Sequence, residues 1–191
     1  MNSAQAKRLM DITLVTVAAT LLLVPMALTA LMVKLTSAGP VLYWSDRVGR
    51  HNIIFKMPKF RSMRLGTPAV ATHLLNNPRG FLTPVGGFLR KSSLDELPQL
   101  WSILVGDMSF VGPRPALFNQ ADLIAQRTEL GVHRLVPGLT GWAQVHGRDE
   151  LPIPQKAALD AYYASHQSIT LDVRVIWMTV LKVLLRDGVS H

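Results

Sequence analysis

The chain has 191 residues, of which 49% are hydrophobic, and a formal net charge of +8. This length suits one domain that buries its own core. The absence of cysteine excludes a disulfide framework, a thiol nucleophile and sulfur redox chemistry, and it is typical of proteins that face the cytoplasm.

Positive charge is concentrated in one part of the chain. Residues 35–94 hold nine Lys or Arg and the single acid Asp46, whereas the remainder holds eleven charges of each sign. Such a segment indicates an anionic partner, which can be nucleic acid, an anionic lipid surface or a phosphorylated small molecule. A merely solvated basic face is the alternative interpretation.

An apolar segment near the N-terminus is long enough to enter a membrane. Residues 12–33 contain no charged residue and no Asn or Gln, and Lys7, Arg8 and Lys34 flank them. About 20 such residues in a helix span the hydrocarbon core of a bilayer. The run exceeds the apolar region of a secretory signal and no small-residue cleavage site follows it, so we interpret it as a retained membrane helix.

Pro25 lies in the middle of this segment and predicts a helix break or kink, because proline cannot donate to the carbonyl of Leu21. Basic residues at both ends favour keeping both ends on the cytoplasmic side. We therefore predict a kinked re-entrant membrane helix as the anchor, residues 1-37. A single-pass helix that tolerates its proline is the alternative.

The rest of the chain, residues 38-191, is predicted to be a second domain of α/β class, mostly helical with a small β-hairpin or sheet. Residues 41–44 and 53–57 have the pattern of short strands joined by a turn that contains Gly49. Residues 62–83 are rich in turn formers and are predicted to be mainly loop, with a short helix around 71–75.

Apolar spacing predicts a helix over 88–104, and its apolar face carries Leu94, Leu97, Leu100, Trp101 and Leu104. Asp95, Gln99 and Ser102 are expected to face elsewhere. Ser93 followed by Glu96 matches a capping box, which places Asp95 in the first turn, where unpaired backbone N–H groups attract phosphate. Pro98 leaves the start of this helix open.

Further helices are predicted over 116–134, 153–166 and 172–186, with a tight loop over 136–142. In the last helix, a row at every fourth position consists of Arg174, Met178, Lys182 and Arg186, and apolar residues cover the other side. This pattern is typical of an interfacial amphipathic helix, and equally of a soluble core helix with extended basic side chains.

The strongest chemical signal is the adjacent pair Asp95 and Glu96 between Arg90 and Arg114. A carboxylate can attack or polarise a phosphate, and the planar arginine forks bind phosphate oxygens bidentately. Phosphate-loop, zinc-protease and serine-hydrolase motifs are absent from the sequence. No aromatic-interleaved basic motif is present either, so we expect no nucleic acid among the partners.

Four blocks in order, 59–63, 89–97, 106–115 and 137–142, resemble the bacterial sugar transferase family of monotopic phosphoglycosyl transferases. The resemblance extends from Lys7 to Ser190, and the chain looks like a minimal catalytic core. It implies transfer of a sugar 1-phosphate from a UDP-sugar to a polyprenyl phosphate, usually undecaprenyl phosphate, with release of UMP. Small members often carry Ser before the helix-breaking proline, where this chain has Val24.

The resemblance also implies roles for individual residues. Asp95 is expected to be the catalytic nucleophile, which forms a phosphosugar-aspartate intermediate and contacts Mg²⁺, and Glu96 is expected to assist it. The phosphate-binding candidates are Arg90, Arg114, Lys59 and Arg61, and Gly141 and Trp142 are expected near the nucleotide.

The resemblance further implies a lipid bilayer as partner and a place in the bacterial inner membrane, with the active site on the cytoplasmic face. Exposed apolar surface is compatible with a homodimer. Residues 147–154 resemble members that act on N-acetylated 6-deoxy sugars, and other sugars stay open. The alternatives are a membrane-anchored, non-enzymatic module that binds anionic lipid or nucleic acid, and a glycosyltransferase that releases UDP.

Overall fold

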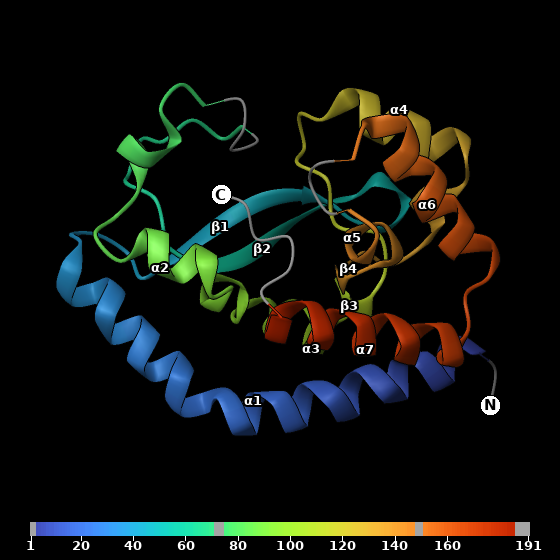
Figure 1. Ribbon diagram of the computed structural model, residues 1–191, viewed down its shortest axis with the longest axis horizontal. Helices are drawn as coiled ribbons and strands as arrows, with labels where there is room; N and C mark the ends of the chain where they lie inside the picture. The colour runs from blue at the N-terminus through green and yellow to red at the C-terminus, as the bar shows by residue number, and fades with distance from the viewer. Residues whose placement is uncertain (1–2, 71–74, 148–150, 186–191) are drawn as a thin grey trace.

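A computed structural model describes residues 3–70, 75–147 and 151–185 (Figure 1). The long helix α1 (Ser3–Thr36) runs along one side, next to α3 (Gln99–Val105) and α7 (Ile169–Leu185). The other α-helices are α2 (Gly86–Lys91), α4 (Ala121–Glu129), α5 (Trp142–Val145) and α6 (Ile153–Ser165). The strands are β1 (Leu42–Val48), β2 (Ile54–Phe60), β3 (Ser109–Val111) and β4 (Gly138–Thr140). The prediction of a mostly helical α/β chain with small sheets is confirmed.

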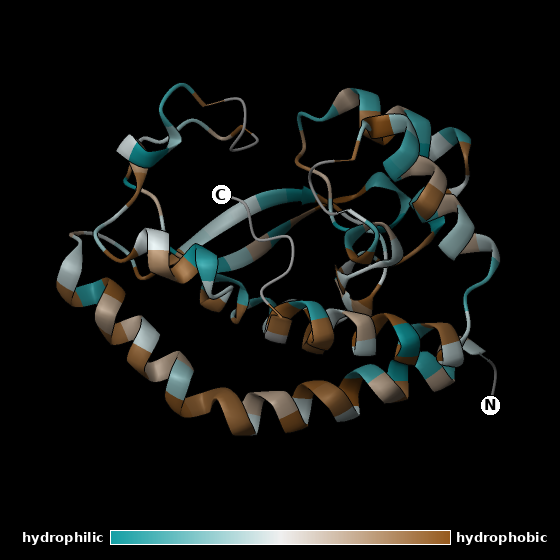
Figure 2. Cartoon of the chain, viewed as in Figure 1, coloured by the Kyte–Doolittle hydropathy of each residue, from teal (hydrophilic) through white to brown (hydrophobic). Residues whose placement is uncertain are grey.

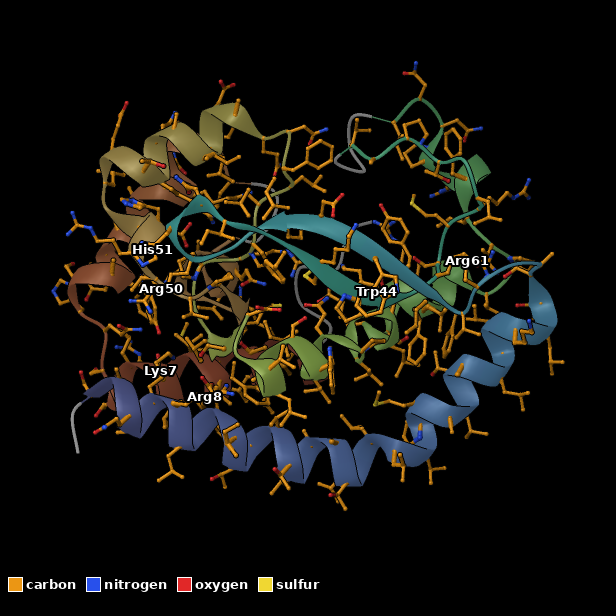
Figure 3. The ribbon with its side chains drawn as sticks, turned by 180° about the vertical axis from the view of Figure 1, so that it is seen from behind. Lys7, Arg8, Trp44, Arg50, His51 and Arg61 are labelled. Atoms are coloured by element: carbon orange, nitrogen blue, oxygen red, sulfur yellow. The ribbon has the colours of Figure 1, made fainter. Side chains whose placement is uncertain are left out.

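The predicted β-hairpin is confirmed. β1 and β2 pair antiparallel along their whole length. His51 and Asn52 in the connecting turn adopt positive φ angles of 56° and 60°, a region in which His and Asn are enriched among residues other than glycine. Arg50 lies in this turn and Arg61 directly follows β2, so the two residues lie at opposite ends of the hairpin, as Figure 3 shows.

The second sheet is a short parallel pair, β3 with β4. Its backbones approach so closely that a Cβ atom on Gly138 would lie 2.1 Å from the backbone nitrogen of Gly112, and one on Gly141 would lie 2.1 Å from the Gly112 carbonyl oxygen. Only glycine fits such an approach. This contact fixes the chain that leads from β3 to Arg114.

Helix α1 has the length and composition of a helix that could cross a membrane. It is continuous, and Pro25 lies inside it rather than at a break between two helices. Figure 1 shows that the helix axis changes direction part-way along its length, and Figure 2 shows that hydrophobic residues dominate its middle. Leu21, Leu23 and Val24 leave most of their surface exposed, as expected of side chains that meet lipid.

Hydroxyl groups in this apolar helix are satisfied locally. The threonines at positions 13, 16, 20, 29 and 36 each donate to the carbonyl oxygen four residues earlier. Bonds of this kind let a hydroxyl enter an apolar environment without an unpaired donor, and they often bend helices.

Both ends of α1 are tied to the rest of the chain. Near its start, the Lys7 ammonium lies 2.6 Å from the carboxylate of Asp172 in α7, and Arg8 donates to the carbonyl oxygens of Ile103 and Leu104. At its end, the buried Arg61 guanidinium donates to the backbone around Ser37. The long apolar helix is thus held from both sides.

Three hydrophobic clusters form the core, and they position the segment between α2 and α3. The first holds Val15, Met57, Leu100, Ile103 and Met108, the second holds Val111, Val145, Tyr163 and Val175, and the third holds Val33, Phe60 and Leu89. The first and third clusters pack α1, the hairpin and the helices α2 and α3 against one another. Residues 92–98, which connect α2 to α3, are therefore held in position at both ends by packed helices.

The C-terminal helices agree with the predictions in part. Helix α6 matches the expected 153–166, whereas the expected helix over 116–134 is limited to α4. The earlier residues bond elsewhere, because Val48 donates to the carbonyl of Ala116 and the Gln120 side chain accepts from the Leu117 backbone. Parts of the short helix expected at 71–75, of the 147–154 stretch and of the 172–186 helix lie outside the described residues.

Candidate active site

Asp95 and Glu96 lie on a short turn rather than in a long helix, so the predicted continuous helix over 88–104 is wrong. Helix α2 ends at Lys91, Ser93 adopts a left-handed φ of 56°, and a single 3₁₀ turn (Leu94–Glu96) precedes α3. A positive φ redirects the backbone and interrupts the ladder of helical hydrogen bonds. The carboxylate pair is thereby presented from a bend between two helices.

The predicted capping box is also wrong. Ser93 makes no capping bond with its side chain in this turn, and the Glu96 carboxylate bonds to Lys59 and Arg114 instead of the Ser93 backbone. Helix α3 begins only after Pro98. Glu96 forms two ion pairs with full positive charges instead of one bond to a backbone N–H, and these two contacts outweigh the local cap.

The faces of α3 differ from the prediction as well. Gln99 and Ser102 are buried, each 1% exposed, whereas Trp101 is 56% exposed and Leu104 is also exposed. The helix restarts after the bend, so the register of a continuous helix does not carry over. Leu100 and Ile103 supply the buried apolar side chains, and α3 presents apolar residues outward.

Asp95 is buried, with 7% of its surface exposed. Burial raises its pKa to about 6, and the neighbouring Glu96 charge adds to the rise, while Lys59, Arg90 and Arg114 oppose it. The carboxylate is therefore little solvated yet mostly ionised at pH 7.5. Such a group has the electrostatics of an activated nucleophile or base.

Glu96 is the hub of the charged cluster. Its Oε1 accepts from the Lys59 ammonium at 2.8 Å and from the Arg114 guanidinium at 2.7 Å. Burial raises the pKa of Glu96, but the charges and hydrogen bonds of Arg114 and Lys59 outweigh burial and hold the pKa well below its usual value. Glu96 therefore stays ionised and fixes two cations beside Asp95.

Arg90 completes the cluster from the last turn of α2. Its Nη1 donates to the Met63 sulfur at 3.4 Å, and its charge lowers the pKa of Asp95. The structure thus brings together five of the predicted site residues: Lys59, Arg90, Asp95, Glu96 and Arg114. A carboxylate ringed by cations fits a substrate that carries several phosphate charges.

Arg61 does not join this cluster. Its guanidinium donates to the carbonyl oxygens of Ser37 and Ala38 and to the Ser37 hydroxyl, and the residue is 3% exposed. These bonds satisfy backbone groups at the end of α1. The structure therefore gives Arg61 a role in holding α1, and its predicted phosphate contact is not supported.

Gly141 and Trp142 also lie apart from the contacts of the cluster. The Trp142 ring stacks on Tyr162 with centroids 5.5 Å apart, and the Arg174 guanidinium lies 5.6 Å from the Trp142 ring centroid. Tyr162 in turn stacks on His166. This aromatic row spans α5, α6 and the start of the following loop.

Sequence reasoning missed a buried ion pair that supports Arg114. Arg127 in α4 donates two hydrogen bonds to Asp160 in α6, at 2.9 and 2.6 Å, and a third to the carbonyl oxygen of Arg114 at 2.8 Å. The pair therefore fixes the backbone from which the Arg114 side chain reaches Glu96. Nothing in the local pattern around Arg127 or Asp160 signals this pairing.

The carboxylates suit a magnesium ion that is shared with a substrate. Mg²⁺ prefers oxygen ligands and is often held by one or two carboxylates together with substrate phosphates. Asp95 and Glu96 supply two such carboxylates, and no group of three or more His, Cys, Asp or Glu residues with metal-binding proximity occurs in the described ranges. The donor set therefore fits a metal that arrives with a phosphate ligand.

Comparison with known proteins decides the family. The model of the family described as "Bacterial sugar transferase" matches residues 2–186. The chain belongs to the bacterial sugar transferase family. The match includes every residue of the charged cluster, so this transferase keeps its acidic pair and basic partners within the family domain.

Individual relatives agree with this assignment. The transferase is 37% identical to an "Uncharacterized sugar transferase EpsL" of Bacillus subtilis, over 97% of this chain and 90% of the relative. It is 40% identical to the "Exopolysaccharide production protein PSS" of Rhizobium leguminosarum, over 94% of this chain and 96% of the relative. It is 38% identical to the "UDP-glucose:undecaprenyl-phosphate glucose-1-phosphate transferase" of Escherichia coli, over 92% of this chain and 39% of the relative.

The transferase therefore spans nearly the whole of two relatives and well under half of the third. Family membership makes the chain an enzyme of the transferase class and removes the non-enzymatic module as an explanation of the basic segment. The long apolar helix is consistent with a membrane location for this enzyme.

Proposed function

We propose that this enzyme transfers a sugar 1-phosphate from a UDP-sugar to undecaprenyl phosphate or a similar polyprenyl phosphate, and releases UMP. The buried Asp95 carboxylate beside three cations carries the proposal. It is supported by the E. coli relative, whose name specifies transfer of glucose 1-phosphate from UDP-glucose to undecaprenyl phosphate. This transfer starts the assembly of a lipid-linked glycoconjugate.

In the first half of the reaction, an Asp95 oxygen attacks the phosphorus that is bonded to the sugar. The bond from that phosphorus to the bridging oxygen breaks, and UMP leaves with the electron pair. The product on the enzyme is a phosphosugar-aspartate. Burial makes the attacking carboxylate poorly solvated, which favours attack, and a covalent intermediate divides one difficult transfer into two easier steps.

In the second half, a phosphate oxygen of the polyprenyl phosphate attacks the same phosphorus. The bond to Asp95 breaks, the carboxylate is restored, and the sugar remains linked to the lipid through a diphosphate. Arg90, Arg114 and Lys59 neutralise charge on the phosphates in both halves. Glu96 holds Lys59 and Arg114 in place.

Magnesium is the expected cofactor, with Asp95 as a ligand and Glu96 next to it. When bound, Mg²⁺ would neutralise charge on the diphosphate and on the departing UMP. Asp95 would hold the metal from the same buried position from which its oxygen attacks the phosphorus. With only Asp95 and the adjacent Glu96 as nearby carboxylates in the charged cluster, the metal would have few protein ligands, as is usual for Mg²⁺ that binds together with substrate phosphates.

We further propose that residues 1-37 form a re-entrant anchor and that residues 38-191 form a catalytic domain on the cytoplasmic face of the inner membrane. The bend of α1 and the basic residues at both of its ends support this arrangement (Figure 1). The exposed apolar residues of α3 and of α7, such as Trp101 and Trp177, would lie at the membrane interface.

Three finer expectations stay predictions. Uridine contact near Gly141 and Trp142 would require substrate to reach the aromatic row. A preference for N-acetylated 6-deoxy sugars rests on the 147–154 stretch, part of which lies outside the described residues. A homodimer would require apolar surface beyond the proposed membrane contact.

The test is a product assay on the full chain in lipid nanodiscs with undecaprenyl phosphate, Mg²⁺ and a panel of UDP-sugars. The proposal predicts UMP as the nucleotide product with at least one sugar, and its loss in Asp95→Asn. UDP as the nucleotide product would identify a glycosyltransferase that moves the sugar alone, and would overturn the proposal.

A further inference from the structure

A second basic site lies away from the charged cluster around Asp95, hereafter the catalytic cluster. A cavity of about 200 Å³ is lined by the first turns of α1, the start of α7 and the chain around 106–109 and 134–136. Its charged lining residues are Lys7, Arg8, Asp11, Arg50, Arg134 and Asp172. Figure 3 shows Lys7 and Arg8 on α1 and Arg50 at the hairpin turn, on the same side of the molecule.

The two acids of this α1–α7 cavity are already engaged. Asp172 accepts from Lys7 and Tyr163, and Asp11 accepts from the Ser109 hydroxyl and the Phe110 backbone. The four basic side chains outnumber the two acids, so the cavity keeps a net positive charge. Positive charge that lines a concave surface concentrates its potential and attracts anions.

Two arginines of the cavity retain donors for a ligand. Arg50 uses its Nε to donate to the Arg134 carbonyl oxygen, and both residues are exposed. Within the described part of the chain, the terminal amino groups of the Arg50 guanidinium and the whole Arg134 guanidinium make no hydrogen bond. Paired arginine forks of this kind match the oxygens of a phosphate.

The position of the cavity distinguishes it from the catalytic cluster. Gly106, which lines the cavity, follows the last residue of α3, whereas Asp95 and Glu96 precede the first. The seven residues of α3 separate the two sites by about 10 Å along the helix. A phosphate held at Asp95 would therefore not fill the cavity.

The position also indicates a lipid. The apolar run of α1 begins at Ile12, one turn after Arg8, so the cavity lies where the polar end of a membrane helix meets lipid headgroups. Helix α7 leaves the cavity at Asp172 and then exposes Val173 and Trp177. A phosphate in the cavity would have apolar surface beside it for acyl chains.

We propose that the α1–α7 cavity binds the phosphate of an anionic phospholipid and thereby fixes the depth of the α1 N-terminus in the membrane. The inference rests on the proposed membrane arrangement of α1 and not on the transfer chemistry. Basic pockets at the polar ends of membrane helices suit anionic headgroups, because arginine contacts replace the water and counterions of the phosphate.

The experiment measures binding of dihexanoyl-phosphatidylglycerol to the full detergent-purified enzyme by calorimetry, below the aggregation concentration of the lipid. Arg50→Gln combined with Arg134→Gln removes the ligand donors and leaves Lys7 and Arg8 in their structural bonds. Arg64→Gln combined with Arg79→Gln is the matched control, because Arg64 also donates its Nε to a carbonyl oxygen and both residues are exposed.

The proposal predicts that affinity falls about tenfold or more in the Arg50 and Arg134 variant and changes less than about twofold in the control. Dihexanoyl-phosphatidylcholine should bind more weakly, because its choline cation meets a positive cavity. Equal losses in both variants would overturn the proposal, and so would unchanged binding in the first. If inorganic phosphate binds as tightly as the lipid, the site takes a free anion and the lipid assignment is wrong.

UMP release measured on the same preparations separates this proposal from the proposed function. The Arg50 and Arg134 variant should keep its UMP release in detergent, because neither residue belongs to the catalytic cluster. A wild-type enzyme that binds the lipid but releases no UMP would contradict the transfer chemistry alone.

Discussion

The Oε1 atom of Glu96 lies 2.7 Å from Nη2 of Arg114, and the same oxygen accepts from Lys59. The carboxylate next to the proposed nucleophile is thus committed to two cations. It holds them where they lower the pKa of Asp95, and their charge can neutralise a phosphate that reaches Asp95. We infer that Glu96 positions these cations, whereas Asp95 performs the attack.

Replacing Asp95 by Asn should lower the rate of UMP release by on the order of 10³-fold or more, because an amide is a poor nucleophile. The same change should stabilise the protein. The pKa of Asp95 is raised from 3.8 to about 6 in the folded protein, so its favourable effect on stability exists below pH 4 and is lost as pH rises through 6.

At pH 7.5, burial of the ionised Asp95 therefore opposes folding, by up to about 3 kcal/mol. Thermal unfolding of Asp95→Asn at this pH should show a higher midpoint than the wild type. Surface-exposed Asp122→Asn serves as the control for loss of one charge. A midpoint below that of the wild type would mean that the Asp95 carboxylate is stabilised by its neighbours.

The pH profile of kcat/KM should report the pKa of Asp95, since this parameter reflects the free enzyme. Activity should fall about tenfold per pH unit below pH 6. Lys59→Met removes a charge that lowers this pKa and should move the acid limb to higher pH. Glu96→Gln removes a charge that raises it but keeps a side-chain oxygen that can accept from Lys59 and Arg114, so it should move the limb to lower pH.

The two shifts are opposite in sign, which a general loss of structure would not produce. Residual activity in each variant suffices for the measurement, because the position of the limb and not its height is compared. Shifts in the same direction would contradict the arrangement of charges around Asp95.

The Arg127–Asp160 pair should affect catalysis through Arg114. Arg127→Gln leaves a buried carboxylate without its partner and should destabilise the protein by about 3–5 kcal/mol. Replacing both residues by Leu should restore much of the melting temperature, because the uncompensated charge is gone. The double variant should still have a raised KM for UDP-sugar, because the bond to the Arg114 carbonyl is lost. A KM equal to that of the wild type would show that the Arg127–Asp160 pair stabilises the fold but does not position Arg114 for substrate binding.

The re-entrant topology can be tested with cysteines, because the natural chain has none. Ser3→Cys and Leu35→Cys place one thiol near each end of α1. An impermeant thiol reagent should label neither variant in intact spheroplasts and both after permeabilisation. Labelling of one variant in intact spheroplasts would show that α1 spans the membrane.

Much of the fold follows from local pattern. Strand alternation and turn residues locate the hairpin, and apolar spacing locates α6. The failures occur where long-range bonds override local preference. The left-handed backbone of Ser93 divides the expected 88–104 helix into two. Because the carbonyl of Ala116 accepts from the Val48 backbone, α4 starts later in the chain than predicted.

The candidate site was predictable in its residue types and less so in its contacts. The sequence places Asp95 and Glu96 between two arginines, but only the fold shows that Glu96 turns toward Lys59 and Arg114. Lys59 and Arg61 are two positions apart at the end of the hairpin. Lys59 joins the charged cluster through Glu96, whereas Arg61 bonds to the backbone at the end of α1. The Arg127–Asp160 pair depends on the packing of α4 against α6, which no local pattern predicts.

The most direct measurement is the intact mass of the enzyme after incubation with a UDP-sugar that it accepts and Mg²⁺, without polyprenyl phosphate. The covalent mechanism predicts a mass increase of one sugar phosphate, located on Asp95 by peptide mapping, with one equivalent of UMP released. UMP that forms only after polyprenyl phosphate is added, with no mass change on Asp95 at any time, would contradict the covalent mechanism.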